Sequence, residues 1–158
     1  MAKIKRYNAT LRNLEYRLRA FKDYFPELLE NAVREKEDVI VKAIQNQLYQ
    51  RGINGKGVKI WDYAPYRPYT IEYKKFMGQP HTRVTLKDTG AFYSGMYVVF
   101  DSDGFYVTSS DEKTKFLVNK YGAEIFRLTN SNLTRIVRVH LRRNIVKEIK
   151  QIIRSVKK

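Results

Sequence analysis

Apolar residues recur at every third or fourth position near both ends of the chain, which is the spacing of one face of an α-helix. In the N-terminal region the series is Leu11, Leu14, Leu18, Phe21 and Phe25. In the C-terminal region it is Leu141, Ile145, Ile149, Ile152 and Val156. These repeats predict amphipathic helices over residues 9–25 and 130–156, each with an apolar face that must be buried against something else.

Pro26 follows the first repeat directly. Proline has no backbone N–H and its ring clashes with the preceding turn, so we expect Pro26 to break or kink the helix. A second helix is predicted from about Glu27 to Gln50, and Gly52 is a suitable residue to end it.

The central region is rich in strand-forming residues. Residues 96–100 and 105–108 contain β-branched and aromatic side chains, and the four residues between them, Asp101-Ser102-Asp103-Gly104, are typical of a hairpin turn. Shorter strands are predicted at 84–86 and 124–128. Together these patterns predict an antiparallel sheet.

Glycine and proline predict a loop over residues 51–69, with short helices at 70–76, 91–94 and 112–120. The predicted fold class is α+β, with a small antiparallel β-sheet flanked by long N- and C-terminal amphipathic helices. We expect a single domain over residues 1–158. It would consist of a helical N-terminal part (1–50), a loop and β-core (51–128) and a basic C-terminal helix (129–158).

Positive charge is concentrated at the two ends. The sequence has 31 Lys and Arg residues against 16 Asp and Glu residues, a formal net charge of +15. Residues 1–20 carry six basic residues and one acid, and residues 134–158 carry nine and one, so the two ends contribute +5 and +8. Such a field attracts polyanions, although a merely solvated basic surface is the alternative. The candidate polyanion-facing residues are Arg135, Arg138, Arg142, Arg143, Lys147, Lys150 and Arg154.

Several functional classes are disfavoured by composition. The chain has no cysteine, which excludes disulfides, thiol catalysis and Cys-based zinc sites. No apolar run is long enough for a membrane span, and no signal peptide is evident, so we expect no membrane association. The two histidines, His81 and His140, have no metal-ligand spacing, so no metal, cofactor or catalytic residue is predicted.

Aromatic and basic residues alternate after the glycine-rich segment. The candidate interface residues are Trp61, Tyr63, Tyr66, Arg67, Tyr69 and Tyr73. Aromatic rings beside arginine are typical of protein interfaces and also of single-strand nucleic-acid sites. The plainer interpretation is that the rings fix a long loop to the core. An interface or a fixed loop is favoured over nucleic acid, because no nucleic-acid-binding signature surrounds them.

The tripeptide Asp88-Thr89-Gly90, followed by Ala91, matches the active-site signature of retroviral-type aspartic proteases. That chemistry needs two carboxyl groups that share one proton across a dimer. Lys87 stands where those enzymes have an apolar residue, and the later Gly-Arg-Asp or Gly-Arg-Asn element is missing. A turn in which Asp88 or Thr89 caps a short helix is therefore favoured.

A longer series of motifs spans residues 52–128. It runs from Gly52 through Trp61 to PYRPYT at 65–70 and YKK at 73–75, then TLKDTGAFYSGM at 85–96, and finally FLVNKYG at 116–122 after the hairpin. This order resembles phage virion-morphogenesis proteins of the tail-completion and neck class, including their Mu-like and HK97-like versions. The sequence Asn-Lys-Tyr at 119–121 stands where that family often has His-Gln.

The resemblance implies an architectural role in the virion without enzymatic activity. Copies of the chain, made in the cytoplasm of a bacterial host, would form a head–tail connector, neck or tail-completion ring. The implied partners are further copies of the chain and neighbouring portal, connector or tail proteins, with non-specific DNA contact through the basic ends. The main alternative is a basic nucleic-acid-binding module, and a less favoured one is an aspartic protease.

Overall fold

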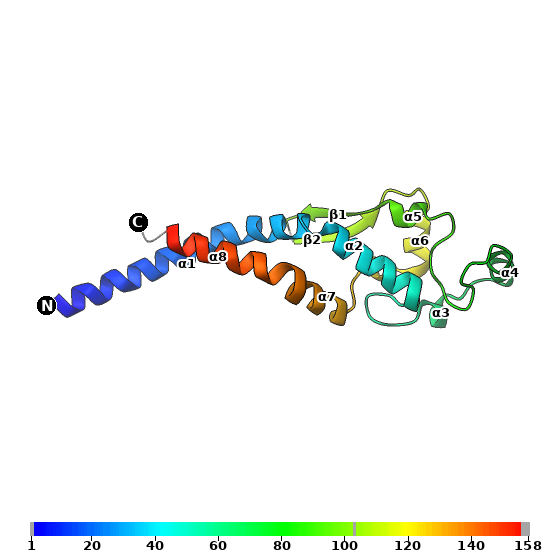
Figure 1. The fold of residues 1–158 in the computed structure, drawn as a ribbon, viewed down its shortest axis with the longest axis horizontal. Helices are drawn as coiled ribbons and strands as arrows, with labels where there is room; N and C mark the ends of the chain where they lie inside the picture. The colour runs from blue at the N-terminus through cyan, green and yellow to red at the C-terminus, as the bar shows by residue number, and fades with distance from the viewer. Residues whose placement is uncertain (1, 103, 156–158) are drawn as a thin grey trace.

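The computed structural model describes residues 2–102 and 104–155. The molecule is elongated, with a two-helix extension at one end and a body of shorter elements at the other (Figure 1). The extension consists of α1 (Ala2–Arg34) and α8 (Arg142–Ser155), which run antiparallel and contact each other. The fold class is α+β, as predicted.

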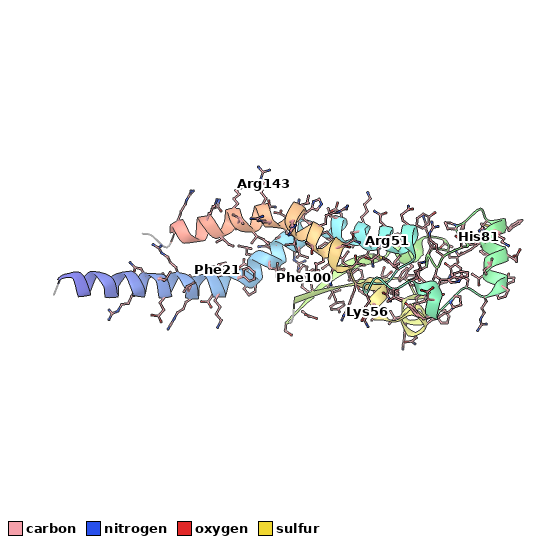
Figure 2. All side chains as sticks on the ribbon, turned by 90° about the horizontal axis from the view of Figure 1, so that it is seen from below. Phe21, Arg51, Lys56, His81, Phe100 and Arg143 are labelled. Atoms are coloured by element: carbon pink, nitrogen blue, oxygen red, sulfur yellow. The ribbon has the colours of Figure 1, made fainter. Side chains whose placement is uncertain are left out.

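The predicted break at Pro26 is wrong, because α1 continues through it. Proline removes the hydrogen bond to the carbonyl of Lys22. Lys22 and Pro26 are both exposed, so water can satisfy that carbonyl. The helix axis changes direction beyond Phe21 (Figure 2). α1 is therefore kinked, which was the alternative prediction for Pro26.

The second N-terminal helix begins after a turn at residues 35–36 rather than at Glu27. It consists of α2 (Glu37–Asn46) and the π-helical turn η1 (Gln47–Arg51). Gly52 ends it with a φ of 60°, as its conformational freedom predicted. The buried side chains of this segment are at helical spacing, namely Ile40, Ile44 and Leu48.

The hairpin is formed by β1 (Met96–Asp101) and β2 (Gly104–Ser109), paired antiparallel. Val98 pairs with Val107, and both side chains enter the core. No further strand pairs with them among the described residues, so the sheet has two strands.

Two predicted strands are absent from the described residues. Residues 84–86 are irregular and 123–126 form the 3₁₀ helix η2 (Ala123–Phe126). The first segment takes its hydrogen bonds from tyrosine side chains, as described below. In the second, the Glu124 carbonyl accepts a hydrogen bond from Gly55, 2.8 Å away. Backbone groups satisfied in this way have no need of a strand partner.

Four short helices connect these parts: α3 (Ile60–Tyr63), α4 (Pro68–Phe76), α5 (Ala91–Ser94) and α6 (Thr114–Tyr121). α4 begins at Pro68 rather than at Thr70, because proline is well suited to the first helical position, where its missing N–H is not needed.

The C-terminal helix is continuous in the described residues. It runs through α7 (Asn130–Ile136), the π-helical turn η3 (Val137–Leu141) and α8. The predicted end at residue 156 lies outside the described residues.

Buried Gln47 fixes the start of the C-terminal helix to the N-terminal region. Its Nε2 donates to the Arg127 carbonyl at 3.0 Å, and its Oε1 accepts from the Thr129 N–H at 3.0 Å. These bonds place the two helical ends on the same core.

Candidate functional site

Five of the six predicted interface residues fall into two overlapping groups in the structure, with Tyr66 in both. Trp61, Tyr63 and Tyr66 fix the loop to the core. The Tyr63 hydroxyl donates to the Tyr121 carbonyl at 2.9 Å, and the Trp61 ring contacts the Tyr66 ring edge-on at 6.1 Å between centroids. These contacts are of the kind that the plainer interpretation predicts.

Tyr66 also explains why residues 84–86 form no strand. Its hydroxyl accepts a hydrogen bond from the Thr85 N–H at 2.9 Å, and the Tyr93 hydroxyl donates to the Thr85 carbonyl. Both backbone groups of this fully buried threonine are thereby satisfied by side chains. Burial raises the pKa of Tyr66 and of Tyr93 above the usual value of a phenol.

The second group lines an exposed groove of about 290 Å³, which we call the tyrosine groove. Tyr69 and Tyr73 from α4 lie on one side, and Phe116 from α6 contributes a further ring. Tyr69 is 81% exposed and Phe116 is 64% exposed. Exposed rings around an apolar depression are typical of binding surfaces. Arg67 is exposed beside α4 but does not line this groove.

The turn Asp88-Thr89-Gly90 lines the same groove. The structure therefore brings together the aromatic segment and the turn, which are separate in the sequence. Gly90 occupies the N-cap of α5 with a φ of 103°, so glycine rather than Asp88 or Thr89 holds the cap position. Thr89 still accepts a hydrogen bond from the Ala91 N–H at 3.3 Å.

Asp88 is exposed and its carboxylate is 3.4 Å from the Lys113 ammonium. An aspartic-protease carboxyl is buried and shares a proton with a second carboxyl. The environment of Asp88 gives that alternative no support.

Lys74 lines the tyrosine groove, although only 5% of it is exposed. Its Nζ donates to the Lys87 carbonyl at 2.6 Å and to Gln79 Oε1 at 2.8 Å, and it lies 5.3 Å from the centre of the Tyr66 ring. Burial lowers the pKa of Lys74, while the charge of Asp88 opposes that shift. An ammonium has three N–H donors, so one is not used by these two bonds.

Sequence reasoning missed Lys74 and Phe116 as groove residues. Lys74 is followed by the exposed Lys75, and Phe116 by the half-buried Leu117. Neighbouring residues differ in burial here because a helix presents them on different faces, and only the packing of each helix on the rest of the body decides which face is covered.

The candidate polyanion-facing residues lie along the C-terminal helix, and all seven are exposed. Five of them surround a shallow depression of about 470 Å³ beside Val146, namely Arg138, Arg142, Arg143, Lys147 and Lys150. Arg135 and Arg154 lie before and after it. Within the described part of the chain, none of the seven forms an ion pair. Figure 2 shows Arg143 pointing away from α1.

No group of three or more His, Asp or Glu residues suited to a metal occurs in residues 2–102 and 104–155. None of the helices described is long and apolar enough to cross a membrane. No protein-family model, curated protein or solved structure matches the chain.

Proposed function

We propose that the chain is a structural protein of a bacteriophage virion, a neck or tail-completion component that acts by assembling into a ring. The supporting observation is that the parts of the motif series meet at the tyrosine groove. PYRPYT contributes Tyr69, TLKDTGAFYSGM contributes the 88–90 turn, and FLVNKYG contributes Phe116. The proposal involves no enzymatic activity and no cofactor.

A ring subunit must bind its neighbours through surfaces that a monomer leaves open. The tyrosine groove meets this requirement, since its exposed rings surround an apolar floor that includes Leu86 and Leu117. The buried ammonium of Lys74 would add a donor for a carboxylate or carbonyl of the neighbouring copy or of a portal, connector or tail protein.

Immunogold labelling of phage particles from the source culture tests the location. Gold at the head–tail junction is the expected result. Unlabelled particles, together with label on nucleic acid in the host, would contradict the proposal.

The tyrosine groove can be tested with purified protein. We expect Tyr69→Ala to weaken assembly about tenfold or more, because truncating an interface aromatic ring commonly costs about 1–2 kcal/mol or more. Sedimentation velocity measures the association, and thermal unfolding should be unchanged because Tyr69 is exposed. Val58→Ala, at an exposed position outside the groove, is the matched control. Unaltered association of Tyr69→Ala would remove the groove from the ring contact.

A second candidate function is a basic nucleic-acid-binding module. The observation that favours it is the unpaired row of arginine and lysine residues on the C-terminal helix. Such a row attracts phosphate groups without reading sequence.

A further inference from the structure

The apolar stripe of α1 extends further than α8 covers it. The Asn144 side chain of α8 donates at 2.9 Å to Glu35, which directly follows α1, and the two helices run antiparallel. We call residues 12–22 the α1 arm, and Figure 1 shows α1 continuing towards its N-terminus beyond the end of the described part of α8.

The α1 arm presents apolar side chains to solvent. Leu14 is 53% exposed and Leu18 is 60% exposed. They belong to a seven-residue repeat that continues through Phe21, Phe25 and Leu28, which is the pattern of a helix that packs along another helix. Covering these exposed apolar side chains with a partner would be favourable, because it removes apolar surface from water.

Charge changes sign along α1. Residues 12–22 contain four basic residues and one acid, whereas residues 27–38 contain five acids and two basic residues. This part of the chain thus has a basic arm (12–22) in α1 and an acidic base (27–38) that continues through the turn after α1 into the start of α2, each with a net charge of magnitude three.

A groove of about 660 Å³ lies between α1 and α8 beside the acidic base, and we call it the α1/α8 groove. Leu28, Ala32 and Ile145 provide apolar surface. Its carboxylates are those of Glu27, Glu35 and Glu148.

Carboxylates outnumber basic side chains in the α1/α8 groove by three to two. Glu27 and Glu148 form no ion pair or hydrogen bond with any described residue. Arg34, which also lines the groove, is already paired with Glu30 at 2.6 Å. Lys147 is the other basic residue of the lining.

We propose that the α1 arm of one copy binds in the α1/α8 groove of a second copy. Leu14 and Leu18 would cover the apolar surface, while Arg12 and Arg17 would approach Glu27 and Glu148. The arginines of the arm and the glutamates of the groove have opposite charges. Both surfaces also present aliphatic side chains from helices. In the ring proposed above, this contact would act in addition to the one at the tyrosine groove. That the contact closes into a ring, rather than repeating along a filament, rests on that proposal.

The contact must be between copies. The arm and the α1 residues that line the groove belong to one continuous helix, so an arm cannot fold back onto its own groove. Arm-to-arm pairing is disfavoured because it brings Arg12 and Arg17 of two copies together. Nucleic acid could neutralise the arm, but phosphate groups would not cover Leu14 and Leu18.

Because arm and groove are different surfaces, the contact is heterologous. Each copy offers an arm to one neighbour and a groove to another. Such a contact repeats around a ring or along a filament.

Charge exchange tests the pairing. We expect Arg12→Glu with Arg17→Glu to weaken association about tenfold or more, and Glu27→Lys with Glu148→Lys to do the same, since like charges oppose the contact. Mixing the two double variants should restore association through complementary charges. Sedimentation velocity on nuclease-treated protein measures association, and circular dichroism verifies that each variant keeps its helices. Wild-type association of either double variant, no recovery on mixing, or a wild-type protein that associates only with nucleic acid would overturn the proposal.

Cross-linking provides a second test, because the chain has no cysteine. One variant carries Arg17→Cys on the arm and another carries Glu148→Cys in the groove. After mild oxidation of the mixture, we expect 17-to-148 disulfides to exceed those formed with Lys115→Cys, an exposed control position on α6. Predominant 17-to-17 disulfides, or cross-linking no greater than the control, would contradict the arm–groove contact. If this contact holds while virions remain unlabelled, the phage role fails and the inference stands.

Discussion

Thr85 shows how single side chains determine the local structure. Its N–H and carbonyl are bonded by two tyrosine hydroxyls, so a segment rich in strand-forming residues lies in the core without a strand partner. The next residue, Leu86, has a φ of 55°, which β-pairing does not permit. The tyrosines therefore stabilise a backbone path that supports the tyrosine groove.

Replacing Tyr66 by Phe should lower the free energy of unfolding by about 1–3 kcal/mol, the usual cost of leaving a buried donor unsatisfied. The donor in question is the Thr85 N–H. Urea unfolding measures the change. Tyr69→Phe, at an exposed position, is the matched control and should stay within about 0.5 kcal/mol of wild type. Equal effects in the two variants would show that the Tyr66 hydroxyl is not needed.

Stability should fall above pH 10. Burial raises the pKa of Tyr66, Tyr93 and Tyr121 from 10.0. Below pH 10 these phenols are protonated in both the folded and the unfolded chain, so their contribution is fully present. As the pH rises above 10, the unfolded chain loses these protons first, and the contribution declines towards the folded pKa by about 1.4 kcal/mol per pH unit for each group.

Urea unfolding between pH 9 and 11 measures this decline. Lys74 acts in the opposite sense below pH 10.5, because burial lowers its pKa. The comparison is therefore between the wild-type protein and Tyr93→Phe, which should reduce the slope by about one proton. An unchanged slope in Tyr93→Phe would be inconsistent with the raised pKa.

Among the helices, α1 departs most from expectation, since a proline lies within it. An internal proline costs about 3 kcal/mol. Here packing after the proline offsets that cost, because Leu28, Ala32 and Val33 are buried against the rest of the protein. The retained kink sets the direction in which the α1 arm leaves the body (Figure 2).

Pro26→Ala should raise the free energy of unfolding by about 1–3 kcal/mol, because it restores a helical hydrogen bond and removes a steric clash. The same change should weaken association of copies, since a straighter α1 aims the arm differently. Thermal unfolding and sedimentation velocity measure the two effects separately. A less stable protein would mean that the kink relieves strain elsewhere, and unchanged association would mean that the arm direction is not required.

At the level of the whole molecule, binding surfaces are distributed along a long axis. The tyrosine groove lies in the body, while the α1/α8 groove and the basic row lie on the extension. Charge is segregated in the same direction, with a basic arm, an acidic base and a basic C-terminal helix. A molecule arranged in this way can bind several neighbours at once.

If the basic row binds DNA, affinity should fall steeply with salt. Replacing Arg142, Arg143 and Lys147 by Ala should reduce the slope of log affinity against log salt by about 0.9 for each phosphate group that the variant no longer neutralises. Fluorescence anisotropy with duplexes of unrelated sequence measures the slope. Replacing the exposed Lys56, Lys59 and Lys115 gives a variant of equal net charge as the control. Equal reductions in both variants would assign the effect to net charge rather than to the row.

The elements that local patterns determine were predictable from the sequence. The two helical ends, the hairpin and the stop at Gly52 follow from apolar spacing, from β-branched residues around a turn and from glycine's access to positive φ. Each of these preferences acts over a few neighbouring residues, so no distant interaction is needed to predict it.

Only the tertiary structure decided the rest. Residues 84–86 and 124–128 have strand-like composition, but side chains and loop backbone distant in sequence satisfy their hydrogen bonds. Pro26 stays within a helix because packing on its far side outweighs a local penalty. The tyrosine groove likewise required α4, the 88–90 turn and α6 to meet. In each case the deciding energy comes from residues far apart in the chain, which local preference does not contain.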